Sequence, residues 1–133
     1  MYGIKIFCVL QMIDDNKLIE YFLGILCQIK VFHWATTHYS KHKALDDLHS
    51  SLSSKVDTLV ECYIGRYKKQ PLKAFKISMS AHSDLTKIDT FLESERETIR
   101  KLSPQFKTAS EIQSIIDDIL MLFNQAIYLC NLK

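Results

Sequence analysis

The sequence predicts an all-α fold, with one helical domain that spans residues 1–133. Apolar residues make up 47% of the chain and charged residues 24%, which is enough to bury a core at this length. Only three Gly and two Pro occur, too few for the turns of a many-stranded sheet. Four separate stretches repeat apolar residues at spacings of three and four, the period of one helix face. These observations predict four helices.

The first two helices follow each other closely. The first is predicted over about residues 16–35, with Asp14 or Asp15 as its cap, and its apolar stripe consists of Leu18, Phe22, Ile25, Leu26, Ile29 and Phe32. After a short polar break, Ser40 is the expected cap of the second helix. That helix is predicted to stop before Gly65, because glycine commonly ends helices, and its stripe consists of Leu45, Leu48, Leu52, Val56, Leu59 and Tyr63.

A long connection separates the second helix from the third. Residues 66–80 begin with basic side chains and then alternate in an extended pattern that has no helical period. The third helix is predicted over about residues 83–102 and is ended by Pro104. The fourth begins at a capping box of Thr108 and Glu111 and runs nearly to the end of the sequence. Four helices with one long connection suit a bundle with a crossover.

Composition and motifs exclude several classes of protein. The net charge is only +2, and both signs are spread along the chain, so strong nucleic-acid binding is not expected. The four cysteines form no CxxC pair and indicate reduced thiols, which favours a cytoplasmic location. Charged residues interrupt both N-terminal apolar stretches, so neither a signal peptide nor a membrane span is expected. There is no GxSxG elbow and no Gly-rich phosphate loop.

Side chains that bind metals gather on one side of the second predicted helix. Four of them fall within about 100° of helix rotation, away from the leucine stripe: His42, Asp46, Asp57 and Glu61. Carboxylate oxygens with neutral imidazole nitrogens suit iron, manganese or zinc. The alternative is the solvated face of an amphipathic helix. His49 lies on the same side and is interpreted as an exposed residue outside the site.

The run from Phe32 to Glu61 resembles the metal-binding segment of Dps-like miniferritins, a branch of the ferritin-like superfamily. The His-Trp pair at the end of that family's first helix is similar to His33-Trp34. The family's second helix carries a His, then an Asp after three residues, an Asp after ten more and a Glu after three more, and this chain matches at His42, Asp46, Asp57 and Glu61. Residues 33–45 are also similar to uncharacterised ferritin-like proteins of large DNA viruses and phages.

The resemblance implies a ferritin-like bundle and a ferroxidase site shared between two subunits of an antiparallel dimer. The ligands would be His33, His42 and Asp46 of one chain and Asp57 and Glu61 of the other. Ferrous iron, or another divalent metal such as zinc or manganese, would bind there. Iron would be oxidised by oxygen or peroxide and stored in a dodecameric shell, with Trp34 as an electron donor.

Two departures from that family leave a second hypothesis open. Eight residues lie between the two histidines where the family has eleven, so the turn is shorter, and His33 has an alternative role as a hydrogen-bonded residue that closes the first helix. No lysine-rich terminus is present, so DNA compaction is not expected, and at this length a dimer is at least as well favoured as a dodecamer. The alternative function is a metal-free helical bundle that serves as a structural or interaction module, for example in a virion or phage-related assembly.

Overall fold

The computed structural model describes residues 17–68, 74–79 and 85–132. These residues contain four α-helices and no β-strand, which confirms the all-α class. The helices and one short 3₁₀ helix are α2 (Lys17–Ala35), α3 (Tyr39–Tyr67), α4 (Leu85–Leu102), η1 (Ser103–Phe106) and α5 (Ser110–Cys130). The expected caps Asp14 and Asp15 and the expected start of the third helix at Ser83 lie outside the described residues.

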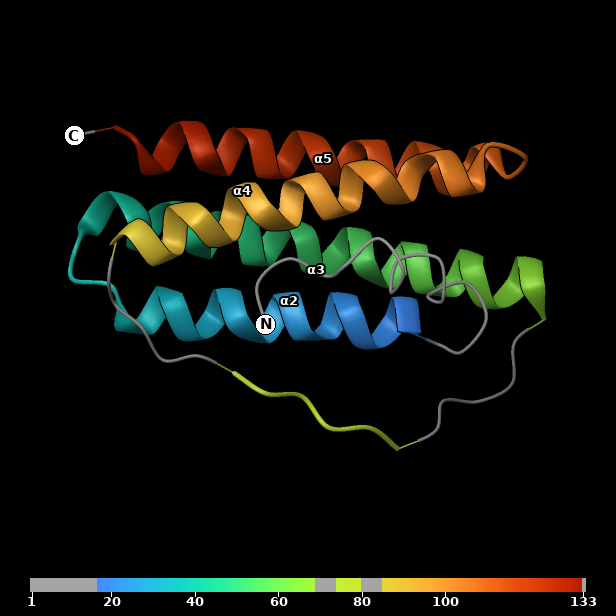
Figure 1. Cartoon of the computed structure of the whole chain (residues 1–133), viewed down its shortest axis with the longest axis horizontal. Helices are drawn as coiled ribbons and strands as arrows, with labels where there is room; N and C mark the ends of the chain where they lie inside the picture. Colours follow the sequence, from blue (N-terminus) through green and yellow to red (C-terminus); the bar gives the residue numbers. More distant parts are fainter. Residues whose placement is uncertain (1–16, 69–73, 80–84, 133) are drawn as a thin grey trace.

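The four helices lie side by side along one axis (Figure 1). α3 packs against α2 and α5, and α5 packs against α4. In Figure 1, α3 and α4 run from left to right, whereas α2 and α5 run from right to left. The end of α3 and the start of α4 therefore lie at opposite ends of the bundle, and a long connection has to join them. Its described part, residues 74–79, is extended, and Ile77 lies next to Gly24 of α2.

The core forms where the apolar stripes of the helices meet. The second predicted stripe is confirmed in full, because all six of its residues are at most 4% exposed: Leu45, Leu48, Leu52, Val56, Leu59 and Tyr63. The rings of Phe32 and Phe91 pack edge to face across α2 and α4, with centroids 5.3 Å apart. Burial of these side chains supplies most of the free energy that holds the bundle together.

Among the described residues, α2 is the one helix that is long and apolar enough to cross a membrane. An 18-residue window of this helix is 56% buried inside the bundle. Phe22, Ile29 and Phe32 of α2 are fully buried against the other helices.

The ends of α3 differ from the prediction. The helix begins after His38, whose side chain makes no capping hydrogen bond, so Ser40 lies in the first turn rather than at the cap. The helix also continues past Gly65 to Tyr67, and Lys68 ends it in the left-handed conformation with φ 51°. Glycine ends a helix only where the chain needs that conformation, and here Lys68 adopts it instead.

The capping box predicted for the fourth helix is wrong. The residue before α5 is Ala109, and no side chain caps it. The Glu111 carboxylate accepts a hydrogen bond of 2.7 Å from Arg66 Nη1, and the Thr108 carbonyl accepts one of 2.9 Å from Arg66 Nη2. The Arg66 guanidinium of α3 therefore bridges two groups at the start of α5, which a local sequence pattern does not reveal.

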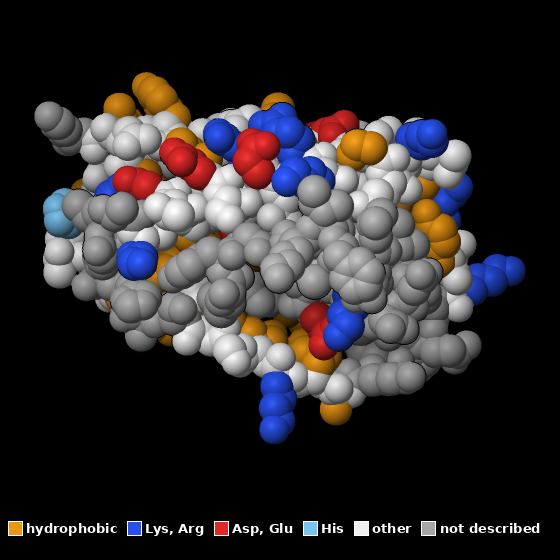
Figure 2. Space-filling view, in the orientation of Figure 1, with side chains coloured by type: hydrophobic (Ala, Val, Ile, Leu, Met, Phe, Trp, Pro, Cys, Tyr) orange, Lys and Arg blue, Asp and Glu red, His pale blue; other side chains and the backbone are white. Residues whose placement is uncertain are grey.

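Charged side chains of both signs lie next to each other over the helices at the top of Figure 2. Ion pairs elsewhere on the helices have the same mixed character: Arg100 Nε lies 3.3 Å from Glu97, and Lys55 Nζ lies 3.0 Å from Asp118. The mixture agrees with the small net charge of the chain.

Candidate functional site

The two histidines meet across the short connection between α2 and α3. His33 is in the last turn of α2 and His42 in the first turns of α3, with only residues 36–38 between the helices. Their rings stack with centroids 3.9 Å apart and an angle of 21° between the planes. His33 Nδ1 lies 2.9 Å from the carbonyl oxygen of His42, and His42 Nδ1 lies 2.9 Å from the carbonyl oxygen of His33.

This reciprocal pair assigns the protons of the neutral rings. A carbonyl oxygen only accepts, so each Nδ1 must carry the hydrogen and donate it. Each Nε2 then keeps its lone pair, which is the state in which a histidine binds a metal. The His33 carbonyl also belongs to the last turn of α2, where carbonyls lack partners inside the helix, so His42 stabilises that end.

Asp46 lies beside the histidine pair. Its Oδ1 atom is 3.9 Å from His33 Nε2 and 3.6 Å from Lys30 Nζ. The His33 side chain is almost fully buried, whereas that of Asp46 is about half exposed. Partial burial lowers the pKa of His49 on the same side of α3, and the positive charge of Lys30 lowers it further. His33 therefore lies beside both His42 and Asp46, and Lys30 competes with His33 for the Asp46 carboxylate.

Asp57 and Glu61 form a second group farther along α3. Both are exposed, and a hydrogen bond and repulsion between the two carboxyl groups raise the pKa of Glu61. In the ranges that the structure describes, neither carboxylate forms an ion pair with a Lys, Arg or His. Asp57 follows Asp46 by eleven positions in the helix, which is about 16 Å along the axis. One chain therefore cannot bring all five predicted ligands together.

A groove between α2 and α3 runs between the two groups. Its volume is about 580 Å³, and it is lined by Ile19, Leu23, Leu26, Ser50, Ser53, Ser54, Val56, Asp57 and Val60. Asp57 thus belongs to a surface with apolar walls and a row of small serines. Among the described residues of a single chain, no three His, Cys, Asp or Glu side chains are close enough together to hold a metal ion.

Sequence reasoning did not identify the mutual hydrogen bonds of the histidines or the role of Lys30. Their positions in the sequence did indicate that the two histidines are close together. His33 lies near the end of one helix and His42 near the start of the next, and only three residues connect the two helices. Trp34, predicted as an electron donor, is 71% exposed, and Lys30 Nζ lies 6.0 Å from the centre of its ring.

Two comparisons with known proteins give matches. Residues 33–130 match a protein family described as a family of unknown function, DUF5856. The chain is also similar to a protein of Enterobacteria phage T4 described as "Uncharacterized 14.6 kDa protein in mobD-ri intergenic region". The two are 30% identical over 123 residues, which cover 89% of this chain and 91% of the phage protein. No solved structure matches. Because the family match covers most of the chain, from His33 to Cys130, the protein belongs to the DUF5856 family.

Proposed function

We propose that two copies of this chain pair through the face formed by α2 and α3 and bind ferrous iron between them, as Dps-like miniferritins do. His33, His42 and Asp46 of one copy face Asp57 and Glu61 of the other. Iron is the substrate, and zinc or manganese are competing ions with similar ligand preferences. The host cytoplasm or a virion is the proposed location.

The observation that carries this proposal is the separation of two complementary ligand groups on one face of α3. The histidine pair offers imidazole nitrogens whose Nδ1 hydrogens are engaged, and Asp46 adds a carboxylate. The Asp57 and Glu61 pair offers two adjacent carboxylates whose like charges repel each other. A cation placed between them would remove that repulsion. Each group is incomplete alone, and an antiparallel partner supplies the other.

A two-fold axis near Ser53 and Ser54 would bring the groups together. In such an interface, a residue that contacts a second residue is contacted by it in turn, so Asp46 lies opposite Glu61 of the partner subunit. The small serine side chains let two α3 helices approach closely. Leu23, Leu26 and Val60, all partly exposed around the groove, supply apolar contact.

The stacked rings restrict how the histidines hold iron. A metal ion lies in the plane of the imidazole that binds it, about 2.0–2.1 Å from the nitrogen. Two nearly parallel rings 3.9 Å apart therefore do not share one ion without rotating. The Nε2 atom of each histidine would therefore be offered to a separate ion, or one of the rings would have to turn. A bound cation would favour the ionised form of Glu61, whose pKa is raised by its hydrogen bond with Asp57 and by the charge of Asp57.

The first test replaces the carboxylate pair. The double variant D57N/E61Q should lose ferrous iron binding, because two of the anionic ligands become neutral while the exposed surface stays polar. Anaerobic titration with ferrous iron, followed by oxygen or peroxide, measures binding and the rate of oxidation. Wild-type protein should saturate at a fixed number of ions per dimer.

Asp47→Asn is the matched control, because Asp47 is an exposed aspartate of α3 that pairs with Lys43 at 3.2 Å. It should bind iron as the wild type does. Unchanged binding by D57N/E61Q, with normal helicity by circular dichroism, would contradict the proposal.

A metal-free role as a structural or interaction module is the second candidate. It is favoured by the ion pair between Lys30 and Asp46 and by the reciprocal hydrogen bonds, which explain the histidines without a ligand. The similarity to a phage protein fits a viral setting. This candidate predicts a defined oligomer that forms equally well in the presence of a chelator and no iron oxidation above the buffer rate.

A further inference from the structure

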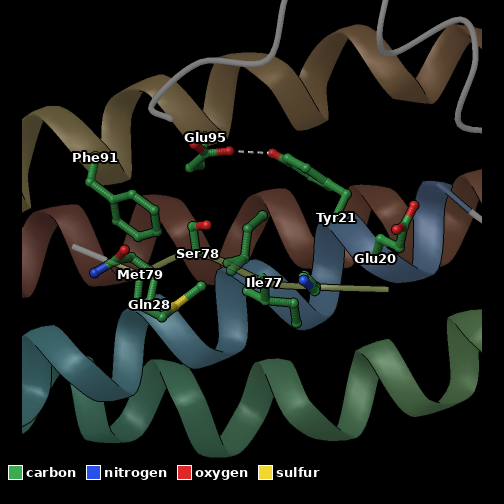
Figure 3. A pocket seen from close by; sticks show the side chains of 11 residues that line it. Glu20, Tyr21, Gln28, Ile77, Ser78, Met79, Phe91 and Glu95 are labelled. Atoms are coloured by element: carbon green, nitrogen blue, oxygen red, sulfur yellow. Dashed lines mark hydrogen bonds between the residues drawn. The ribbon is translucent and has the colours of Figure 1, made fainter. Parts of the chain in front are cut away.

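A cavity lies between α2, α4 and the extended segment 74–79, away from the histidine pair. Its volume is about 240 Å³, and Figure 3 shows the side chains that converge on it from the three elements. They are Glu20, Tyr21, Ile25, Gln28, Lys76, Ile77, Ser78, Met79, Phe91 and Glu95, together with Gly24. The volume suits a small organic molecule rather than a peptide.

The absence of a side chain at Gly24 helps to keep this cavity open. Among the residues that the structure describes, a methyl group placed there would meet Ile77 alone, at an ordinary contact distance of 3.8 Å. The glycine is therefore not required by crowding, and a larger side chain at this position would point toward Ile77 on the cavity wall. Phe91 and Ile25, both nearly fully buried, give the cavity apolar walls.

One side of the cavity carries a buried carboxylate. Glu95 is only 3% exposed, and it accepts a hydrogen bond of 2.5 Å from the hydroxyl of Tyr21, drawn as a dashed line in Figure 3. Burial raises the pKa of Tyr21 well above its usual value, and the negative charge of Glu95 raises it further. Tyr21 is thus a neutral donor to Glu95, and its hydroxyl adds no charge.

The remaining charges sit on less buried lining residues. Glu20 and Lys76 have opposite signs, and Glu20 lies 3.2 Å from Lys17. A carboxylate has about four lone-pair positions, so Glu95 is able to accept from a ligand in addition to its partners in the chain. A ligand inside the cavity would meet apolar walls and the buried carboxylate of Glu95, together with the less buried and oppositely charged Glu20 and Lys76. A charge-assisted hydrogen bond to Glu95 is stronger than a hydrogen bond between neutral groups.

We propose that this cavity is a binding site for a small organic cation, with an apolar body against Phe91 and Ile25 and a protonated amine directed at Glu95. The site is independent of the iron site, since no residue of the histidine pair or of the carboxylate pair lines it.

The experiment uses 2-phenylethylamine as the probe, with 2-phenylethanol and 3-phenylpropionate as neutral and anionic probes of similar size. Isothermal titration calorimetry and ¹H–¹⁵N NMR shifts measure binding to the whole chain. The amine should bind at one site per chain, and the alcohol and the acid at least about tenfold more weakly, because they lose the bond to a charged group.

Two variants locate the site. Gly24→Leu should fill the cavity and abolish amine binding, whereas Gly65→Leu, a second helical glycine with no neighbour within 4 Å, should leave it unchanged. Glu95→Gln should weaken binding at least about tenfold. If that variant does not fold, the Gly24→Leu result decides alone. The proposal is overturned by no amine binding, by equal affinity for the alcohol, or by amine binding that survives Gly24→Leu.

Discussion

His33 and His42 close the turn between α2 and α3, since each imidazole hydrogen-bonds the backbone of the other. Replacing His42 with Ala removes one ring of the stack and leaves the His33 carbonyl without its donor. We expect the free energy of unfolding to fall by about 1–3 kcal/mol, measured by urea denaturation. His38→Ala removes an exposed ring and should change it by less than about 0.5 kcal/mol. Equal losses in the two variants would contradict the role of the pair.

His49 gives a pH dependence with a definite sign. Its pKa in the folded chain is lowered by partial burial and by Lys30, so the unfolded chain binds a proton more readily. Stability should therefore decrease as the pH falls below the ordinary histidine pKa of about 6.5 and level off below the lower folded-state pKa. His49→Gln should show a smaller decrease between pH 7.5 and pH 5, measured by urea denaturation. An identical decrease in both proteins would contradict this assignment.

The spacing of the candidate ligands along the sequence predicted that they share one face of a helix, because the helical period alone sets that arrangement. His42, Asp46, Asp57 and Glu61 do lie along one side of α3. The hydrogen-bond partner of a side chain, in contrast, does not follow from the helical period. The partner of the His33 ring is a backbone carbonyl nine positions away, and it depends on the path of the turn rather than on any spacing.

At the scale of elements, Lys41 connects three helices. Its ammonium group is buried near the start of α3 and donates to Asp89 of α4 at 2.7 Å and to the carbonyl of Cys130 in α5 at 3.2 Å. Lys41→Ala should lower the free energy of unfolding by about 2–4 kcal/mol, because a buried pair is broken. Lys43→Ala, at an exposed lysine, should cost less than about 1 kcal/mol. Similar costs in thermal or urea unfolding would contradict the bridging role.

The helix interiors were predictable and their ends were not, for a physical reason. The stripe from Leu45 to Tyr63 depends only on burial repeated at the helical period. The ends depend on contacts between elements: Arg66 of α3 holds the start of α5, so Glu111 is not free to form a capping box. A lysine in the left-handed conformation, Lys68, ends α3 where glycine was expected to do so.

At the scale of the whole molecule, the four-helix class was predictable because four periodic stretches and a non-helical connection leave few other arrangements. The site was predictable only in part. One chain places the histidine group and the carboxylate group about 16 Å apart on α3, so the proposed site would need a second copy of the chain to complete it. The sequence of a single chain shows the candidate ligands, whereas their meeting would depend on which faces of two copies pair.

Mixing two defective chains tests this central claim most directly. One chain carries His33→Gln and Asp46→Asn, and the other carries Asp57→Asn and Glu61→Gln. After the two are unfolded together and refolded, each mixed dimer should contain one intact site where the wild type has two, because the intact histidine group of the second chain faces the intact carboxylates of the first. Ferrous iron titration should then show binding in the mixture and none in either chain refolded alone. A mixture as inactive as its components, with mixed dimers demonstrated by native mass spectrometry, would contradict a site shared between subunits.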